Sequence, residues 1–186
     1  GVAATFSAKK PKGRWIIDPL DGTTNFVHGF PYFCVSLAAE WDGHIQVGVI
    51  YHPIHDELYT AIRGQGAFLN GKRLKVSQVR HLKDALLTTG FSYQTGKKLD
   101  LEIRRFGQIS KMAQAIRRPG SAALDLAFTA RGIFDAFWEK NLSPWDIAAG
   151  SLLVTEAGGK ISQIDGGRFK YMSGEIIASN AFLHRE

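Results

Sequence analysis

Two dipeptides, Asp42-Gly43 and Asn70-Gly71, constrain the fold more than any other local feature of this 186-residue sequence. The first joins the apolar runs 32–42 and 44–53, and the second lies inside the run 66–74. Asp-Gly and Asn-Gly favour two-residue hairpin turns, because both central residues of such turns adopt positive φ. We therefore predict an antiparallel sheet in the first part of the chain. Its further strands are predicted at 14–18 and 57–64.

The pattern changes after about residue 80, where helical and strand-like segments alternate, as is typical of α/β structure. The strands predicted in this part are 85–91, 133–139, 160–164 and 175–180. The predicted helices are 99–114, 121–132 and 146–159. We predict an antiparallel, β-rich subdomain over residues 1–80 and an α/β subdomain over residues 81–186, with the small and basic residues 1–13 forming a loop.

Composition excludes several classes of protein. With 45% hydrophobic and 22% charged residues the chain is typical of a globular protein, and no apolar run approaches the ~18–20 residues of a membrane span. The single cysteine, Cys34, lies in an apolar run and is interpreted as a reduced core residue, which favours a cytoplasmic location. The net charge of +6 is spread over many segments without a nucleic-acid-binding motif, so we interpret it as solvated surface.

Two acids, Asp18 and Asp21, follow the first predicted strand with Pro19 between them. Either one alone is explained as an ordinary turn residue. A turn that brought both carboxylates together would raise their pKa values unless a cation neutralised them. Mg²⁺ is the natural partner, because it prefers carboxylate and carbonyl oxygens, and the Leu20 carbonyl lies between the two acids.

The residues after Asp21 fit a second purpose. Gly22, Thr23 and Thr24 open a predicted helical turn, where backbone N–H groups are suited to binding phosphate. Metal carboxylates beside such an anion site indicate phosphoryl chemistry. A third acid, Asp146, precedes an alanine-rich helix. Taken alone, Asp146 is best explained as a helix N-cap.

The segments DPLDGTTNF at 18–26 and WDIAAGSLLVTEAGG at 145–159 resemble the two signature motifs of the inositol monophosphatase family. Three other segments resemble the family in order and spacing, so that the resemblance covers nearly the whole chain: residues 48–77, 117–139 and 176–180. The resemblance implies a layered αβαβα fold of the sugar-phosphatase type. It also implies a metal-dependent, lithium-sensitive phosphatase.

The resemblance assigns roles to individual residues. Asp18, Asp21 and Asp146 match the metal-binding aspartates, and Leu20 matches a position that offers its backbone carbonyl to the metal. Asp146 then caps and coordinates at once. The residues implied in substrate binding are Gly22 and Thr23, whose N–H groups hold phosphate, Gly120, Ser121 and Ala122, which line the pocket, and Glu139, which accepts hydrogen bonds from polyol hydroxyls. The hydroxyl of Thr23 is implied to lie near the attacking water.

The resemblance also implies a helical segment of roughly 70–80 residues before the position of Gly1. In the family this segment ends in a Gly-Glu-Glu-like motif whose glutamate is another metal ligand. We therefore expect the sequence to be part of a longer chain, and expect that chain to form a homodimer.

The function expected from these features is a Mg²⁺-dependent phosphomonoesterase that hydrolyses myo-inositol 1-phosphate. The family motif leaves three alternative substrates open: fructose 1,6-bisphosphate, 3′-phosphoadenosine 5′-phosphate and histidinol phosphate. Glu139 favours a polyol, because a carboxylate accepts hydrogen bonds from hydroxyl groups. An alternative of another class, ranked lower, is a protein that binds RNA or the transcription machinery through its basic surface.

Overall fold

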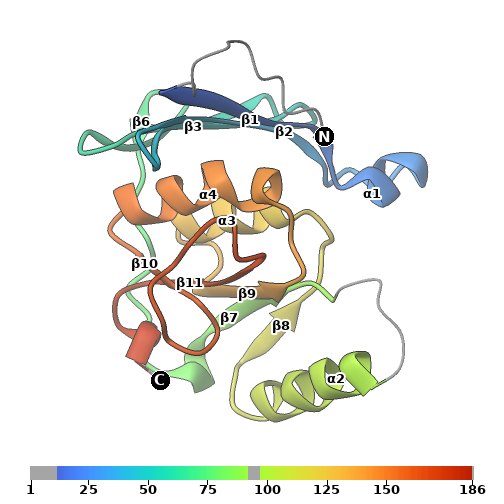
Figure 1. Cartoon of the computed structure of the whole chain (residues 1–186). Coiled ribbons are helices and arrows are strands. Elements are labelled where there is room, and N and C mark those ends of the chain that lie inside the picture. Colours follow the sequence, from blue (N-terminus) through green and yellow to red (C-terminus); the bar gives the residue numbers. More distant parts are fainter. Residues whose placement is uncertain (1–11, 92–96, 186) are drawn as a thin grey trace.

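The computed structural model of the chain describes residues 12–91 and 97–185. Figure 1 shows its elements in four layers: a β-sheet, the helices α3 and α4, a second β-sheet, and helix α2 on the far side. This is a mixed α and β sandwich, as the sequence predicts. Among these residues no helix is long and apolar enough to cross a membrane.

The first sheet contains six antiparallel strands in sequence order: β1 (Gly13–Asp21), β2 (Cys34–Trp41), β3 (His44–His52), β4 (Glu57–Ile62), β5 (Gly66–Leu69) and β6 (Lys72–Arg73). Both predicted hairpin turns are present. Asp42 and Asn70 have φ of 48° and 46°, and the glycine that follows each of them is also in the positive region. The sequence-local turns therefore determine the order of this sheet, because each joins two strands that pair directly.

The second sheet has the order β10 (Lys160–Ser162), β11 (Glu175–Ser179), β9 (Ala136–Lys140), β7 (Leu86–Thr89) and β8 (Ala115–Arg117). Strand β7 pairs in parallel with β8 and β9, whereas β9, β11 and β10 pair antiparallel. The sequence did not predict β8. Its three residues follow the end of α2 (Lys97–Ser110), where the helical spacing of apolar residues continues through a turn.

Helices α3 (Ala122–Ala130) and α4 (Pro144–Glu156) form the layer between the two sheets. Eight residues in each helix are buried, which explains why both sequences are apolar on all sides. The two helices pack closely at Gly150, where a Cβ atom would lie 2.5 Å from Cβ of Leu126. The largest hydrophobic cluster contains residues of the first sheet, both helices and the second sheet, and so holds the layers together.

Three short segments complete the described chain: α1 (Thr23–Val27), η1 (Leu82–Asp84) and η2 (Leu183–Arg185). The predicted strand 14–18 is longer than expected, because β1 runs from Gly13 to Asp21. Of the predicted loop 1–13, residues 1–11 lie outside the described residues and Gly13 belongs to β1. The division of the chain at residue 80 stays a prediction.

Candidate metal centre

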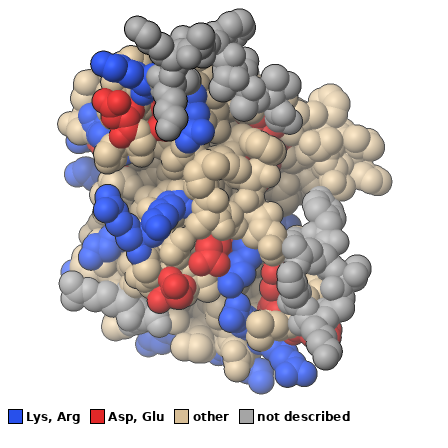
Figure 2. All heavy atoms as spheres, in the orientation of Figure 1, with Lys and Arg blue, Asp and Glu red and all other residues tan. Residues whose placement is uncertain are grey.

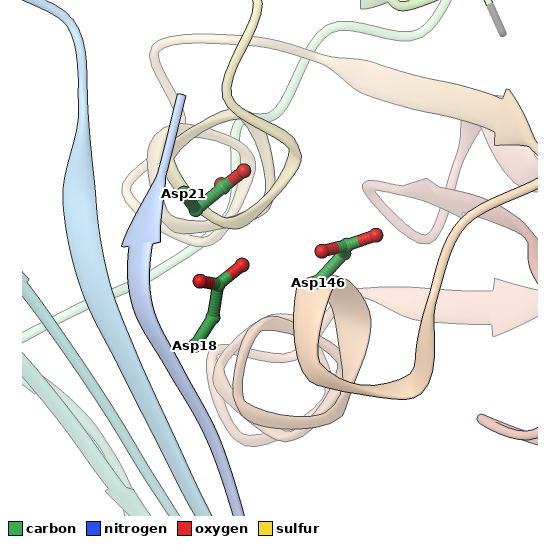
Figure 3. A group of neighbouring side chains, drawn as sticks. All are labelled: Asp18, Asp21 and Asp146. Carbon is green, nitrogen blue, oxygen red and sulfur yellow. The ribbon is translucent and has the colours of Figure 1, made fainter. Parts of the chain in front are cut away.

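Three carboxylates converge in the structure. Asp18 and Asp21 lie on β1, and Asp146 lies in the first turn of α4. One oxygen atom of each lies within 4.8 Å of the others, and Figure 3 shows the three side chains around one space between β1 and α4. The three acids singled out from the sequence are therefore brought together by the fold.

A bulge in β1 places Asp18 and Asp21 on the same side of the sheet. Asp18 is opposite Ser36 and Asp21 is opposite Cys34, so that three steps along β1 match two steps along β2. Side chains alternate along a regular strand, and residues three apart would point to opposite faces. The extra residue in β1 removes this alternation. The sequence predicts a turn after the strand, whereas in the structure Pro19 and Leu20 lie within the bulged strand.

The carboxylate of Asp21 accepts two hydrogen bonds from the start of α3. Its Oδ2 accepts a hydrogen bond of 2.6 Å from the Ser121 hydroxyl and one of 2.8 Å from the Ala123 N–H. Burial nevertheless raises the pKa of Asp21 to about 6, and the charge of Asp18 adds to the increase. The thiol of Cys34 lies 4.0 Å from the same oxygen. Sequence reasoning treated Cys34 only as a core residue and missed this contact, which no local pattern signals.

Asp146 has both a structural and an electrostatic role. Ser143 is the N-cap of α4, and Asp146 is the third residue of the helix, where its Oδ2 accepts the Ser143 N–H at 2.7 Å. The interpretation of Asp146 as the N-cap itself is therefore wrong by three positions, although it does take part in a capping box. Burial raises the pKa of Asp146 to about 7, and the charges of Asp21 and Asp18 contribute.

The loop between β1 and α1 is shaped by Gly22. This residue has φ of 87°, and a Cβ atom there would lie 2.8 Å from the Tyr32 carbonyl oxygen. Only glycine adopts this conformation at little cost and also avoids the clash. Around it, the Thr23 hydroxyl donates to the Leu20 carbonyl at 2.9 Å, and the Leu20 N–H donates to Asp18 Oδ1 at 3.0 Å.

Asn25 was missed by the sequence analysis. Its side-chain N–H₂ group donates to the carbonyls of Tyr32 at 2.7 Å and Pro119 at 2.8 Å. It thereby joins α1 to the segment that precedes α3. A lone asparagine after two threonines suggests only a helical turn, so its distant partner could not be predicted from the sequence.

The acids open into a cleft of about 900 Å³. Leu20, Gly22, Thr23, Gly120 and Ala122 line it together with the three aspartates. The side chain of Ser121 is buried and directed to Asp21 instead.

Glu139, on β9, lines the same cleft as the aspartates. Burial raises the pKa of Glu139 well above its usual range, and the charges of Asp125 and Asp21 add to this effect. Gly90 keeps space for it, since a Cβ atom there would lie 2.2 Å from the Glu139 carboxylate. Arg118 stacks on the ring of Phe91 at the same rim, with its guanidinium carbon 4.5 Å from the ring centre.

The donor set fits a hard divalent cation. Carboxylate oxygens of three described residues converge here and Leu20 lines the same cleft, and carboxylate and carbonyl oxygens are the ligands that Mg²⁺ prefers. The pKa values of Asp21 and Asp146 are raised because negative charge is unfavourable in this partly dehydrated place. A bound cation would remove this cause.

Comparison with known proteins identifies the relatives of the chain. The sequence pattern of the inositol monophosphatase family matches residues 3–186. Nus factor SuhB of Pseudomonas aeruginosa is 48% identical over 168 residues, which are 89% of this chain and 62% of that protein. Inositol-1-monophosphatase of Mesorhizobium japonicum is 48% identical over 172 residues, covering 92% of this chain and 65% of that protein.

The solved structure of inositol monophosphatase from Anabaena (Nostoc) sp. PCC 7120 superimposes with a TM-score of 0.90 at 45% identity. The match covers 95% of this chain and 70% of that structure. The chain thus spans less than two thirds of the length of the two curated relatives, 62% and 65% respectively.

Proposed function

The chain belongs to the inositol monophosphatase family, and we propose that it carries the metal and phosphate sites of a Mg²⁺-dependent phosphomonoesterase acting on inositol monophosphate. The observation that carries this proposal is the cluster of three aspartates, with oxygens within 4.8 Å of one another, at the wall of a large cleft. Carboxylates that repel one another in a cleft are suited to hold a cation against a phosphate.

Each residue of the cluster has a place in the proposed reaction. Asp18, Asp21 and Asp146 would hold the metal, with the Leu20 carbonyl as a further oxygen ligand. A divalent cation bound there supplies the Lewis-acid chemistry that lowers the pKa of water and neutralises phosphate. The hydrogen bonds from Ser121 and Ala123 favour the charged form of Asp21.

The phosphate would lie on the backbone of the glycine-containing loop. Gly22 and Thr23 line the cleft beside the aspartates, and their N–H groups are proposed to hold the phosphate oxygens. The Thr23 hydroxyl, which is held by the Leu20 carbonyl, would orient the attacking water.

The organic part of the substrate would fill the other side of the cleft. Gly120, Ser121 and Ala122 form the start of α3 there, and Glu139 faces them from β9. A carboxyl group at Glu139 accepts hydrogen bonds when charged and also donates one when protonated, which matches the hydroxyl groups of a polyol. This chemistry favours inositol 1-phosphate over the alternatives.

Phosphate release by the complete protein that carries this chain tests the proposal. With Mg²⁺, inositol 1-phosphate should be hydrolysed with a higher kcat/KM than the three alternative substrates. Asp18→Asn should abolish the activity, whereas Asp165→Asn, on an exposed loop, should retain it. Persisting activity in Asp18→Asn would refute the metal assignment. A higher kcat/KM on one of the other phosphates would assign that compound as the substrate.

A second candidate function has one observation in its favour, the name Nus factor that several relatives carry. The complete protein would then bind RNA or the transcription machinery. Binding of RNA should weaken steeply between low and moderate salt, because phosphate contacts release counterions. A flat response would reject it. This role is compatible with the phosphatase activity.

We further propose that the complete protein is a cytoplasmic homodimer and that lithium inhibits it. Sedimentation of the complete protein tests the dimer, and cell fractionation tests the location. Phosphatase assays with added lithium chloride test the inhibition, with sodium chloride at the same ionic strength as the control.

A further inference from the structure

A second cavity, which is lined by basic residues, lies at the opposite end of α4 from the metal centre. Its volume is about 410 Å³. It is lined by Thr155 at the end of α4, by Lys160 and neighbouring residues of β10, by the loop at 166–168 and by His184. Asp146 and Thr155 are separated by nine residues of one helix, which corresponds to about 13 Å at ~1.5 Å per residue.

The lining side chains of this cavity carry positive charge without a matching acid. Lys160 and Arg168 are exposed, and within the described part of the chain neither has a carboxylate within the 4.0 Å of an ion pair. Asp165, in the same loop, accepts the Gly167 N–H at 2.8 Å and does not line the cavity. Figure 2 shows Lys and Arg side chains on the side of the molecule that carries β10 and the C-terminal end of α4, with acidic side chains next to them.

His184 adds a hydrogen-bonding group to the two cations. Its Nδ1 lies 2.8 Å from the Ser179 hydroxyl, and Nε2 has no hydrogen-bond partner among residues 12–91 and 97–185. When the serine donates to Nδ1, the neutral imidazole carries its proton on Nε2. Burial lowers the pKa of His184, and the charge of Lys160 lowers it further.

Three backbone carbonyls at the end of α4 already have hydrogen-bond donors, which reduces their repulsion of an anion in this cavity. The last carbonyls of a helix carry partial negative charge when they are unsatisfied. Here the carbonyl of Val154 accepts the Gly159 N–H at 2.9 Å, and that of Thr155 accepts the Gly158 N–H at 3.1 Å. The carbonyl of Ala157 accepts the Val76 N–H at 3.1 Å. These three carbonyls are therefore already hydrogen-bonded to backbone donors.

We propose that this cavity is a second anion site, in which Lys160, Arg168 and His184 bind the phosphate group of a small molecule. Lys and Arg side chains bind phosphate through charge-assisted hydrogen bonds, and an imidazole N–H is a further donor. The cavity has room for more than inorganic phosphate, so the phosphate of a small ester is included. The site stands apart from the aspartate cluster and does not depend on the proposed catalysis.

The test is a calorimetric titration of the complete protein with inorganic phosphate, and then with glycerol 3-phosphate, in the presence of a metal chelator. Lys160→Gln and Arg168→Gln should each weaken binding about tenfold, as expected for the loss of a charge-assisted hydrogen bond. The matched control is Lys170→Gln, which removes an exposed cation from the same loop but not from the cavity. Glycerol should not bind, because it lacks the phosphate.

Two further measurements separate this site from the metal centre. Proton NMR of the His184 imidazole should show a shift and a raised pKa on addition of phosphate. Asp18→Asn, which should abolish hydrolysis, should leave this binding unchanged. The proposal is overturned if neither ligand binds, if the His184 signal does not move, or if Lys170→Gln weakens binding as much as Lys160→Gln does.

Discussion

The hydroxyl of Ser121 donates a 2.6 Å hydrogen bond to the carboxylate of Asp21, across 100 residues of sequence. This bond connects the bulge of β1 to the N-cap of α3. Ser121 also accepts the Leu124 N–H at 3.4 Å with the same oxygen. One small side chain therefore begins a helix and holds a proposed metal ligand in position.

Ser121→Ala should weaken metal binding. The hydrogen bond favours the charged form of Asp21, so its removal should raise the pKa of Asp21 above about 6. A hydrogen bond to a charged group contributes ~1.5–3 kcal/mol, which predicts at least about tenfold weaker Mg²⁺ binding near pH 6. Calorimetric titration with Mg²⁺ measures this. Ser151→Ala, which removes a buried serine bonded to the Ala148 carbonyl, is the control and should bind Mg²⁺ normally.

The metal-free protein should lose stability as the pH rises. Asp21 and Asp146 have folded-state pKa values of about 6 and about 7, above the ~4 of an unfolded aspartate. The folded state binds these protons more tightly, so their contribution to the free energy of unfolding falls between about pH 4 and pH 7. Asp146→Asn should remove part of this loss.

Urea unfolding with a metal chelator at pH 4 and pH 8 tests this prediction. The free energy of unfolding of Asp146→Asn minus that of the wild type should be more favourable at pH 8 than at pH 4. Taking this difference cancels the titration of other groups. It should bind Mg²⁺ poorly. An Asp146→Asn protein that is equally destabilised at both pH values would show that the hydrogen bond to Ser143 outweighs the electrostatic term.

Gly22→Ala should destabilise the loop before α1 by more than its backbone conformation alone explains. Both Gly22 and Gly29 have positive φ, 87° and 71°, which costs a non-glycine residue ~1–2 kcal/mol. Only Gly22 faces a clash, with the Tyr32 carbonyl, whereas nothing lies within 4 Å of a Cβ atom at Gly29. Gly29→Ala is therefore the control for the conformational cost. The free energy of unfolding of Gly22→Ala should be lower by about a further 1–3 kcal/mol.

Asn25→Ala should alter substrate binding, because Asn25 lines the cleft beside the proposed phosphate site. Loss of its hydrogen bonds to the Tyr32 and Pro119 carbonyls frees α1 from the segment that leads to Gly120. We expect a higher KM, lower kcat and a free energy of unfolding reduced by about 1–3 kcal/mol. Steady-state kinetics on inositol 1-phosphate and urea unfolding measure both effects. Unchanged kinetics in a destabilised protein would limit Asn25 to a structural role.

The sequence predicted those elements that form through interactions between residues close together in the chain. The hairpins at Asp42 and Asn70 followed from the positive φ that their turns need, and α3 and α4 followed from apolar runs bounded by glycine. Strand β8 was missed, because its three residues have no pattern of their own and form a strand by pairing with the distant β7. Asn25 and Cys34 were missed at the site because their partners are distant or on another strand.

From the sequence, Asp18, Asp21 and Asp146 could be singled out as candidate metal ligands, because they lie in two motifs that match one family. Their convergence depends on the folded structure. The bulge in β1 turns Asp21 to the side of Asp18, and the packing of α4 between the sheets brings Asp146 to both. The raised pKa values are likewise a tertiary property, since burial and neighbouring charge arise only when distant segments pack together.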